Sequence, residues 1–286
     1  MKLDALVVPE PDLKVTVDLV RFLESSGFHC AWIADSPPLG WPDLYATLAT
    51  IHRLSGGRAA LGIGVGYSAV RAAGLRPATL ATLTEYVADL RRTWEARNVS
   101  IPIYIAASGP KALLAAGRLG DGAMVTVGTH PALVRRALAQ IRQGAERAGR
   151  DPRNIDAVFL AGMAIADDWE EAKREASPVA ARRAKDADFH PEFFLPYELE
   201  HLRPDAERVA RAYDVKRHVD PDAPHNRLVT DELVDALALA GTPERCAQKL
   251  EAMREAGAAR VALFPAGTER RQALERFVHA VLPRLA

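Results

Sequence analysis

Short apolar runs alternate with amphipathic stretches along most of the chain. Such runs predict strands buried on both faces, and apolar residues at helical spacing predict helices between them. Strands are predicted near residues 3, 29, 58, 101, 123, 155 and 260, seven in all. Helices are predicted at 12–26, 43–54, 77–96, 111–119, 131–148, 168–185, 198–213, 231–240, 242–257 and 268–285.

The clearest unit is the stretch 101–129, which begins with an apolar strand and a turn, Ser108-Gly109-Pro110. A helix follows from Lys111, and a second apolar strand ends at Gly128. Two strands joined through a helix lie parallel. Free N–H groups at the helix start and the charge of Lys111 favour an anion, with phosphate as the natural guest. The alternative is an ordinary tight turn with a capping serine.

Strand and helix alternate without a long linker, a composition break or a sequence repeat, so residues 1–286 are predicted to form a single domain. An irregular insertion rich in Pro, His and Asp is expected at about 186–230. Parallel strands with right-handed crossovers allow an open doubly wound sheet or a TIM-like (β/α) barrel. The even spacing of the strands favours the barrel, whose active site lies at the carboxyl ends of its strands.

Composition narrows the possible partners. The chain has 37 basic and 37 acidic side chains, so no net charge favours nucleic acid or a membrane surface. Its two cysteines and eight histidines show no metal-ligand spacing, so no metal is expected. No stretch approaches the ~20 apolar residues of a membrane span, and no signal peptide is recognisable. A reducing, cytoplasmic location fits.

Four stretches, 27–37, 54–77, 101–128 and 240–265, together resemble the bacterial luciferase-like superfamily. They are most similar to its coenzyme F420-dependent branch, which includes methylenetetrahydromethanopterin reductase. The resemblance spans nearly the whole chain and is weakest over 186–230. It implies a TIM-like barrel that binds a flavin or deazaflavin at the carboxyl ends of its strands. A small-molecule substrate and a homodimer are expected.

The resemblance also implies a set of site residues. Asp35 and Ser36 match the strand end that faces the cofactor ring, and Asp35 is the predicted catalytic residue, although it could instead cap the next turn. Three residues match a loop beside the ring and four match the segment at the cofactor phosphate. One more is a candidate because it ends the next strand of the expected barrel. In that order they are Gly64, Gly66 and Ser68; Ser108, Gly109, Pro110 and Lys111; and Gly128. Glycines admit a flat ring close to the backbone.

One departure from the family is predicted. The helix at 43–54 runs directly into LSGGR, where relatives carry a further strand and helix, so one βα unit is expected to be absent. The favoured function is an F420-dependent oxidoreductase that passes a hydride between the deazaflavin and a small organic substrate. The alternatives are an FMN-dependent luciferase-like monooxygenase and a cofactor-binding barrel with little or no catalytic activity. A barrel isomerase or aldolase would need a lysine or an acid–base pair at the strand ends, which the sequence does not show.

Overall fold

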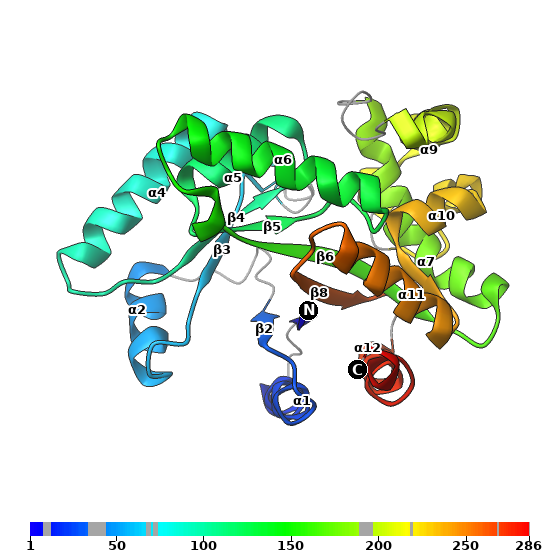
Figure 1. The fold of residues 1–286 in the computed structure, drawn as a ribbon, viewed down its shortest axis with the longest axis horizontal. Coiled ribbons are helices and arrows are strands. Elements are labelled where there is room, and N and C mark those ends of the chain that lie inside the picture. Colours follow the sequence, from blue (N-terminus) through cyan, green and yellow to red (C-terminus); the bar gives the residue numbers. More distant parts are fainter. Residues whose placement is uncertain are drawn as a thin grey trace. The chain divides into compact units, whose positions relative to one another are not determined.

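The computed structural model describes residues 1–7, 13–33, 44–66, 70, 74–188, 197–217, 220–267 and 269–285. Strands and helices alternate along these ranges (Figure 1). The strands are β1 Lys2–Val7, β2 Cys30–Ile33, β3 Leu61–Ile63, β4 Ile103–Ala107, β5 Gly122–Val125, β6 Asp156–Ile165, β7 Leu239–Gly241 and β8 Arg260–Pro265. The helices are α1 Leu13–Ser25, α2 Leu44–Leu54, α4 Leu80–Glu95, α5 Pro110–Leu119, α6 Pro131–Arg147, α7 Trp169–Ala184, α9 Arg203–Ala212, α10 Asp231–Leu237, α11 Pro243–Glu255 and α12 Arg270–Arg276.

The chain divides into two compact units. Unit 1 comprises Met1–Ala34, Thr126–Ala137 and Val158–Ala286, and unit 2 comprises Asp35–Val125 and Leu138–Ala157. In unit 1 the strands are ordered β2-β1-β8-β6-β7, and in unit 2 they are ordered β3-β4-β5. Every one of these ladders is parallel, which confirms the predicted α/β class. The prediction of a single domain over 1–286 stays a prediction.

The prediction of seven strands is wrong, because the described residues contain eight. The additional strand, β7, occupies the end of the helix predicted at 231–240. Helix α10 stops at Leu237 because Ala238 is extended (φ −133°, ψ 155°), and the next three residues pair with Met163–Ile165 of β6. The run ALALAG suits a buried helix and a buried strand equally, so only the partner strand decides between them.

The expected loss of one βα unit falls between the strands near 29 and 58. In the described residues β2 pairs with β1 in unit 1, and β3 pairs with β4 in unit 2. The residues that separate these two strands along the chain include 34–43, which lie outside the described ranges. The absence of one βα unit therefore stays a prediction.

The described part of the irregular stretch 186–230 consists of short helices around α9. Its centre is His225, which is only 2% exposed and stacks on Tyr213 with ring centroids 4.3 Å apart. The backbone N–H of Asp214 donates to His225 Nδ1 (3.4 Å), and burial raises the pKa of Tyr213 to about 12. A buried histidine stacked on a half-buried tyrosine thus gives this polar segment its own small core.

A buried ion pair connects three strands of unit 1. Asp4 on β1 is fully buried and accepts hydrogen bonds at Oδ2 from Arg260 Nε (2.7 Å) and Trp32 Nε1 (2.8 Å). His29 Nδ1 faces the other carboxylate oxygen at 3.5 Å. Arg260 is itself 5% exposed, so each charge depends on the other for compensation.

We expect Asp4→Ala to destabilise the protein by about 3–5 kcal/mol, because it leaves the Arg260 guanidinium buried without a counter-charge. Urea unfolding measures the loss. The control is Asp18→Ala, which removes an exposed partner of Lys14 and should leave the unfolding midpoint close to wild type. Equal midpoints for the two variants would contradict a stabilising role for the buried pair.

Burial lowers the pKa of His225 below its ordinary value of 6.5, and it does the same to His130. As the pH falls through 6.5, these histidines take up protons in the unfolded chain before they do so in the folded protein. The contribution of the two histidines to the free energy of unfolding is therefore constant above that pH and decreases below it. Urea unfolding between about pH 7.5 and about pH 5 should show this slope. The slope should become shallower in His225→Gln, in which His130 still contributes, and should stay unchanged in His279→Gln, which alters an exposed histidine. Equal slopes in the two variants would contradict the assignment to His225.

Candidate functional site

Two loops of unit 2 leave the sheet at the same edge. β3 and β4 pair in register, with Ile63 opposite Ile105, so Gly64 follows β3 directly beside Ala106. A Cβ atom at Gly64 would lie 2.9 Å from the Cβ of Ala106, closer than such atoms approach. Gly66 adopts φ +74° in the turn that follows. The predicted glycines 64 and 66 are therefore required by the close approach and by the turn.

The start of α5 lies at the carboxyl end of β4. Pro110 occupies the first helical turn as predicted, and Gly109 is the N-cap (φ −94°, ψ 165°) without a side-chain capping bond. A capping role for Ser108, one of the alternatives, is therefore wrong. The first-turn N–H groups of Lys111 and Ala112 have no acceptor within the helix because of their position. Glycine at the cap thus leaves backbone donors available to an external anion.

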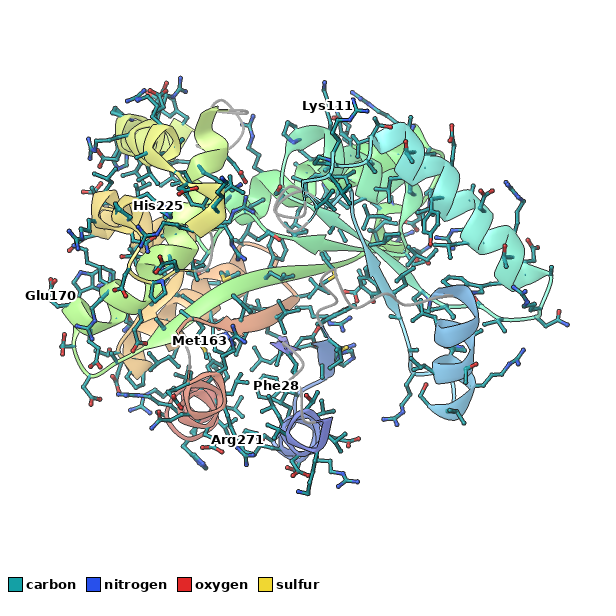
Figure 2. The ribbon with its side chains drawn as sticks, turned by 180° about the vertical axis from the view of Figure 1, so that it is seen from behind. Phe28, Lys111, Met163, Glu170, His225 and Arg271 are labelled. Carbon is teal, nitrogen blue, oxygen red and sulfur yellow. The ribbon has the colours of Figure 1, made fainter. Side chains whose placement is uncertain are left out.

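Lys111 adds a positive charge to this helix start. Its side chain is exposed, and Figure 2 labels it near the start of α5. Within the described ranges no ion pair involves it. The structure brings Ser108, Gly109, Pro110 and Lys111 together in one turn, as chain continuity requires. It also places Gly64 on the neighbouring strand, which the sequence alone did not show.

Helix α5 is held in place by direct backbone packing against α6. A Cβ at Gly117 would lie 2.0 Å from the carbonyl oxygen of Ile141, and one at Gly144 would lie 2.1 Å from that of Leu114. Arg150 donates to the carbonyl oxygen of Gly117 at 2.9 Å. A residue larger than glycine at either position would push the two helices apart. This close crossing therefore fixes the N–H groups at the start of α5 in position.

One face of the β3–β4–β5 sheet carries small side chains. Gly62 and Ala106 on this face are exposed, and Tyr104 beside them is half-buried. The Tyr104 hydroxyl donates to Asp156 Oδ2 (2.7 Å), and its ring covers Gly122, where a Cβ would lie 2.3 Å from the ring. The backbone at Gly62 and Ala106 is therefore accessible on this face of the sheet.

Gly128 lies in unit 1, in contact with α10. It adopts φ +113°, and a Cβ there would lie 2.9 Å from the carbonyl oxygen of Ala236. The next residue, Thr129, is buried and donates through its N–H to Ala236 O (3.0 Å) and through Oγ1 to Ala238 O (2.9 Å). The geometry gives Gly128 a packing role, and its predicted role in cofactor binding stays a prediction.

Three predicted site residues, Asp35, Ser36 and Ser68, lie outside the described residues. Asp35 therefore stays a prediction as the catalytic residue. Across the ranges that the structure covers, no group of three or more His, Cys, Asp or Glu side chains could hold a metal ion. In the same ranges no helix is long and apolar enough to cross a membrane.

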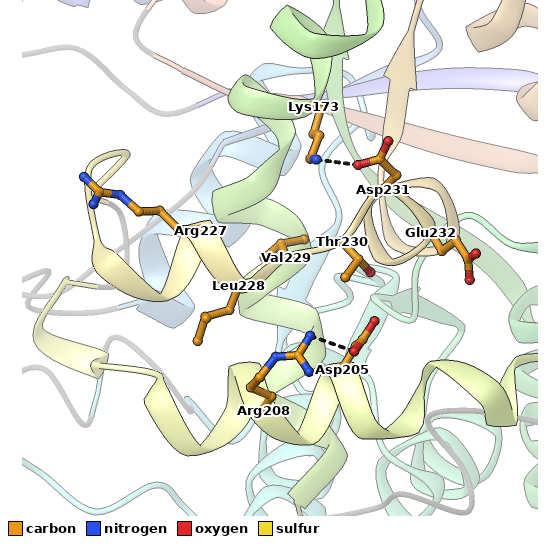
Figure 3. A pocket seen from close by; sticks show the side chains of 9 residues that line it. All are labelled: Lys173, Asp205, Arg208, Arg227, Leu228, Val229, Thr230, Asp231 and Glu232. Carbon is orange, nitrogen blue, oxygen red and sulfur yellow. Dashed lines mark hydrogen bonds and ion pairs between the residues drawn. The ribbon is translucent and has the colours of Figure 1, made fainter.

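The larger of two described cavities, about 550 Å³, lies in unit 1 and not at this site (Figure 3). It is lined by α7, α9 and the start of α10. Its lining has three basic and three acidic side chains, and four of them form two pairs: Lys173 with Asp231, and Arg208 with Asp205 at 2.7 Å. Trp169 Nε1 also donates to Asp231 (2.8 Å). These pairs leave little unbalanced charge for a ligand.

The fold and the glycine-rich strand ends agree with one known family. Residues 37–260 match the family model described as luciferase-like monooxygenase. The chain belongs to this family. Its likeness to curated proteins extends further along the chain.

A 5,10-methylenetetrahydromethanopterin reductase of Methanolobus tindarius is 29% identical over 252 residues, which cover 80% of this chain and 75% of that protein. The enzyme of the same name from Archaeoglobus fulgidus is 27% identical over 341 aligned positions that span both chains completely. Because that alignment is longer than the 286 residues of this chain, the relative has residues without a counterpart here. These relatives are oxidoreductases.

A solved structure supports the fold. The coenzyme F420-dependent tetrahydromethanopterin reductase of Methanopyrus kandleri superposes with a TM-score of 0.75, at 21% identity, over 100% of this chain and 99% of the other. The predicted α/β fold of the luciferase-like type is thereby confirmed.

Sequence reasoning missed two groups of charged residues. Asp4 lies inside the first strand but is bonded to Trp32 and Arg260, so it is part of the packing and not of a reaction site. A cavity around Asp235 and Lys249 joins residues from three helices. Neither group has a spacing that the sequence reveals, because its members meet only after strands and helices pack.

The packing role of Gly128 can be separated from its backbone strain. Gly149 also has a positive φ (+68°), but nothing lies within 4 Å of the position that a Cβ atom would take there. We expect Gly149→Ala to cost about 1–2 kcal/mol from strain alone, and Gly128→Ala to cost about 1–3 kcal/mol more from overpacking. Urea unfolding compares the two. Equal losses would contradict the contact with α10.

Proposed function

We propose that this protein is an F420-dependent oxidoreductase that transfers a hydride between the deazaflavin and a small organic substrate. The observation that carries the proposal is the uncapped start of α5, with exposed Lys111, beside the Gly64 turn. The start of a helix attracts the phosphate of such a cofactor, and the glycine turn gives its ring access to the backbone.

The described residues fit the group. The N–H groups of Lys111 and Ala112 and the Lys111 ammonium would hold the phosphate, because they are donors without an acceptor in the helix. Gly62, Gly64 and Ala106 would lie beside the ring. When bound, F420 supplies two-electron hydride chemistry, and the protein supplies binding and orientation. No acid–base pair is needed beyond an orienting group, for which Asp35 is the candidate.

The relatives support the same assignment. The solved reductase is described as coenzyme F420 dependent, and two curated relatives carry the name of methylenetetrahydromethanopterin reductase. The expected absence of a βα unit does not affect the anion site, since β3, β4 and the start of α5 all lie in the described residues. We therefore favour an active enzyme over a binding protein without activity.

FMN is the second candidate cofactor. The family model that matches residues 37–260 is described as a monooxygenase, and FMN shares the phosphate and the flat ring. The phosphate site at α5 suits both cofactors, so binding must be measured for each. The small-molecule substrate and the homodimer are part of the proposal.

Fluorescence titration of the purified protein with F420 and with FMN tests the assignment. We expect F420 to bind more tightly. Gly109→Asp should weaken binding by more than about tenfold, because it places a carboxylate at the phosphate position. Lys111→Ala should cost only about fivefold, since an exposed charge contributes under ~1 kcal/mol.

Gly109→Asn is the matched control, because it has the size of aspartate without the charge. Asparagine can still cap the first-turn N–H groups, so an affinity between those of wild type and Gly109→Asp would assign the remaining difference to repulsion of the phosphate. Tight FMN binding without F420 binding would overturn the choice of cofactor. Unchanged affinity in Gly109→Asp would move the phosphate away from α5.

A further inference from the structure

A second cavity, of about 310 Å³, lies in unit 1 where α6 begins and where α10 ends against α11. Its polar lining consists of Thr129, His130, Asp235, Arg245, Gln248 and Lys249. Pro131 and Ala252 complete it. No residue proposed for cofactor binding lines this cavity.

A charged network crosses the cavity. Asp235 Oδ1 accepts from Lys249 Nζ and from Arg245 Nη2, both at 2.9 Å. Lys249 also donates to the backbone carbonyl of Asp235 at the end of α10. Two cations thus share one carboxylate, and the cavity keeps a positive surplus. Lys249 carries this charge with a side chain only 14% exposed.

The network leaves hydrogen-bond donors unused. An ammonium has three N–H donors and a guanidinium has five. Among the described contacts Lys249 uses two and Arg245 uses one, so both retain donors. Both described bonds to the Asp235 carboxylate end on Oδ1, so Oδ2 is the acceptor that remains, and the unused donors outnumber it.

Arg245 is held in position although 47% of its side chain is exposed. Its guanidinium lies over the Trp169 ring, 4.6 Å from the centroid, and the indole N–H is fixed by Asp231. A cation stacked on an aromatic ring keeps its edge available for a bidentate contact with an oxyanion. The site is therefore ordered before any ligand arrives.

His130 provides a further donor. Its Nδ1 accepts from the backbone N–H of Ala132 (3.2 Å), so the proton of the neutral ring is assigned to Nε2. Burial is the main cause that lowers the pKa of His130, and Lys249 adds to the effect. The lowered pKa favours the neutral ring, whose Nε2 proton adds a donor without adding charge.

We propose that this cavity binds a small oxyanion, a phosphate or a carboxylate, through Arg245 and Lys249. Charge-assisted bonds to the unused donors would compensate the positive surplus that Asp235 leaves. The bond between Lys249 and the end of α10 stays in place, because the ligand needs only the donors that remain. The proposal is independent of the cofactor site on α5.

Calorimetric titration with sodium phosphate and with sodium acetate, at constant ionic strength, tests the proposal. The titrations use Gly109→Asp protein, in which the proposed anion site on α5 is blocked. Arg245→Gln should weaken binding of the preferred anion about tenfold. Gln248→Glu, which adds a carboxylate at the exposed side of the cavity, should weaken it at least as much. Arg254→Gln on the same helix, which removes a partner of Glu251, should leave it unchanged.

Tighter binding of phosphate would identify a phosphate ligand, and tighter binding of acetate would identify a carboxylate. Absence of binding to the Gly109→Asp protein, or equal affinities in Arg245→Gln and Arg254→Gln, would overturn the proposal. If wild-type protein binds phosphate and Gly109→Asp abolishes that binding, the result would support the α5 site and reject this cavity. The two hypotheses can therefore fail separately.

Discussion

The crossing of α5 and α6 is the constraint on which the candidate site depends. At Gly117 and Gly144 the two helix backbones lie so close that a Cβ atom would collide with a carbonyl oxygen. This contact fixes α5 against α6, and with it the direction of the N–H groups at the start of α5. Because the cap is glycine, no side chain competes with an incoming anion for these donors. In the proposed site, binding would thus depend on backbone packing and not on a row of reactive side chains.

The two ionic networks of unit 1 illustrate different outcomes of burial. Asp4 and Arg260 form a closed pair, since both are buried and Trp32 adds a further bond. Such a pair is a structural element whose charges compensate each other. Around Asp235, two cations share one carboxylate next to a cavity. There the surplus charge and the unused donors leave room for a ligand. Both networks pair an aspartate with basic side chains. They differ in the number of cations that share one carboxylate.

The two cavities of unit 1 show why volume is a poor guide to function. The larger one is lined by equal numbers of acidic and basic side chains, most of which pair with each other. The smaller one has a positive surplus and a stacked arginine. Neither coincides with the start of α5, where exposed backbone and glycine would admit the cofactor. A flat cofactor needs an accessible backbone and fixed donors, and these do not require a deep cavity in the free protein.

The sequence by itself determined the α/β class, the unit from β4 to β5 and the helix start at Pro110, because periodicity and turn residues act locally. The motifs also determined the family, since they occur in order along most of the chain. Only the tertiary structure decided that Leu239–Gly241 is a strand. An apolar run of that kind can form a helix or a strand, and here β6 provides the backbone partners that a strand needs. The tertiary structure likewise placed Gly64 beside Ala106, gave Gly128 its contact with α10, and brought Asp235 to Lys249. These contacts join residues far apart in sequence or on separate elements, and no local preference encodes them.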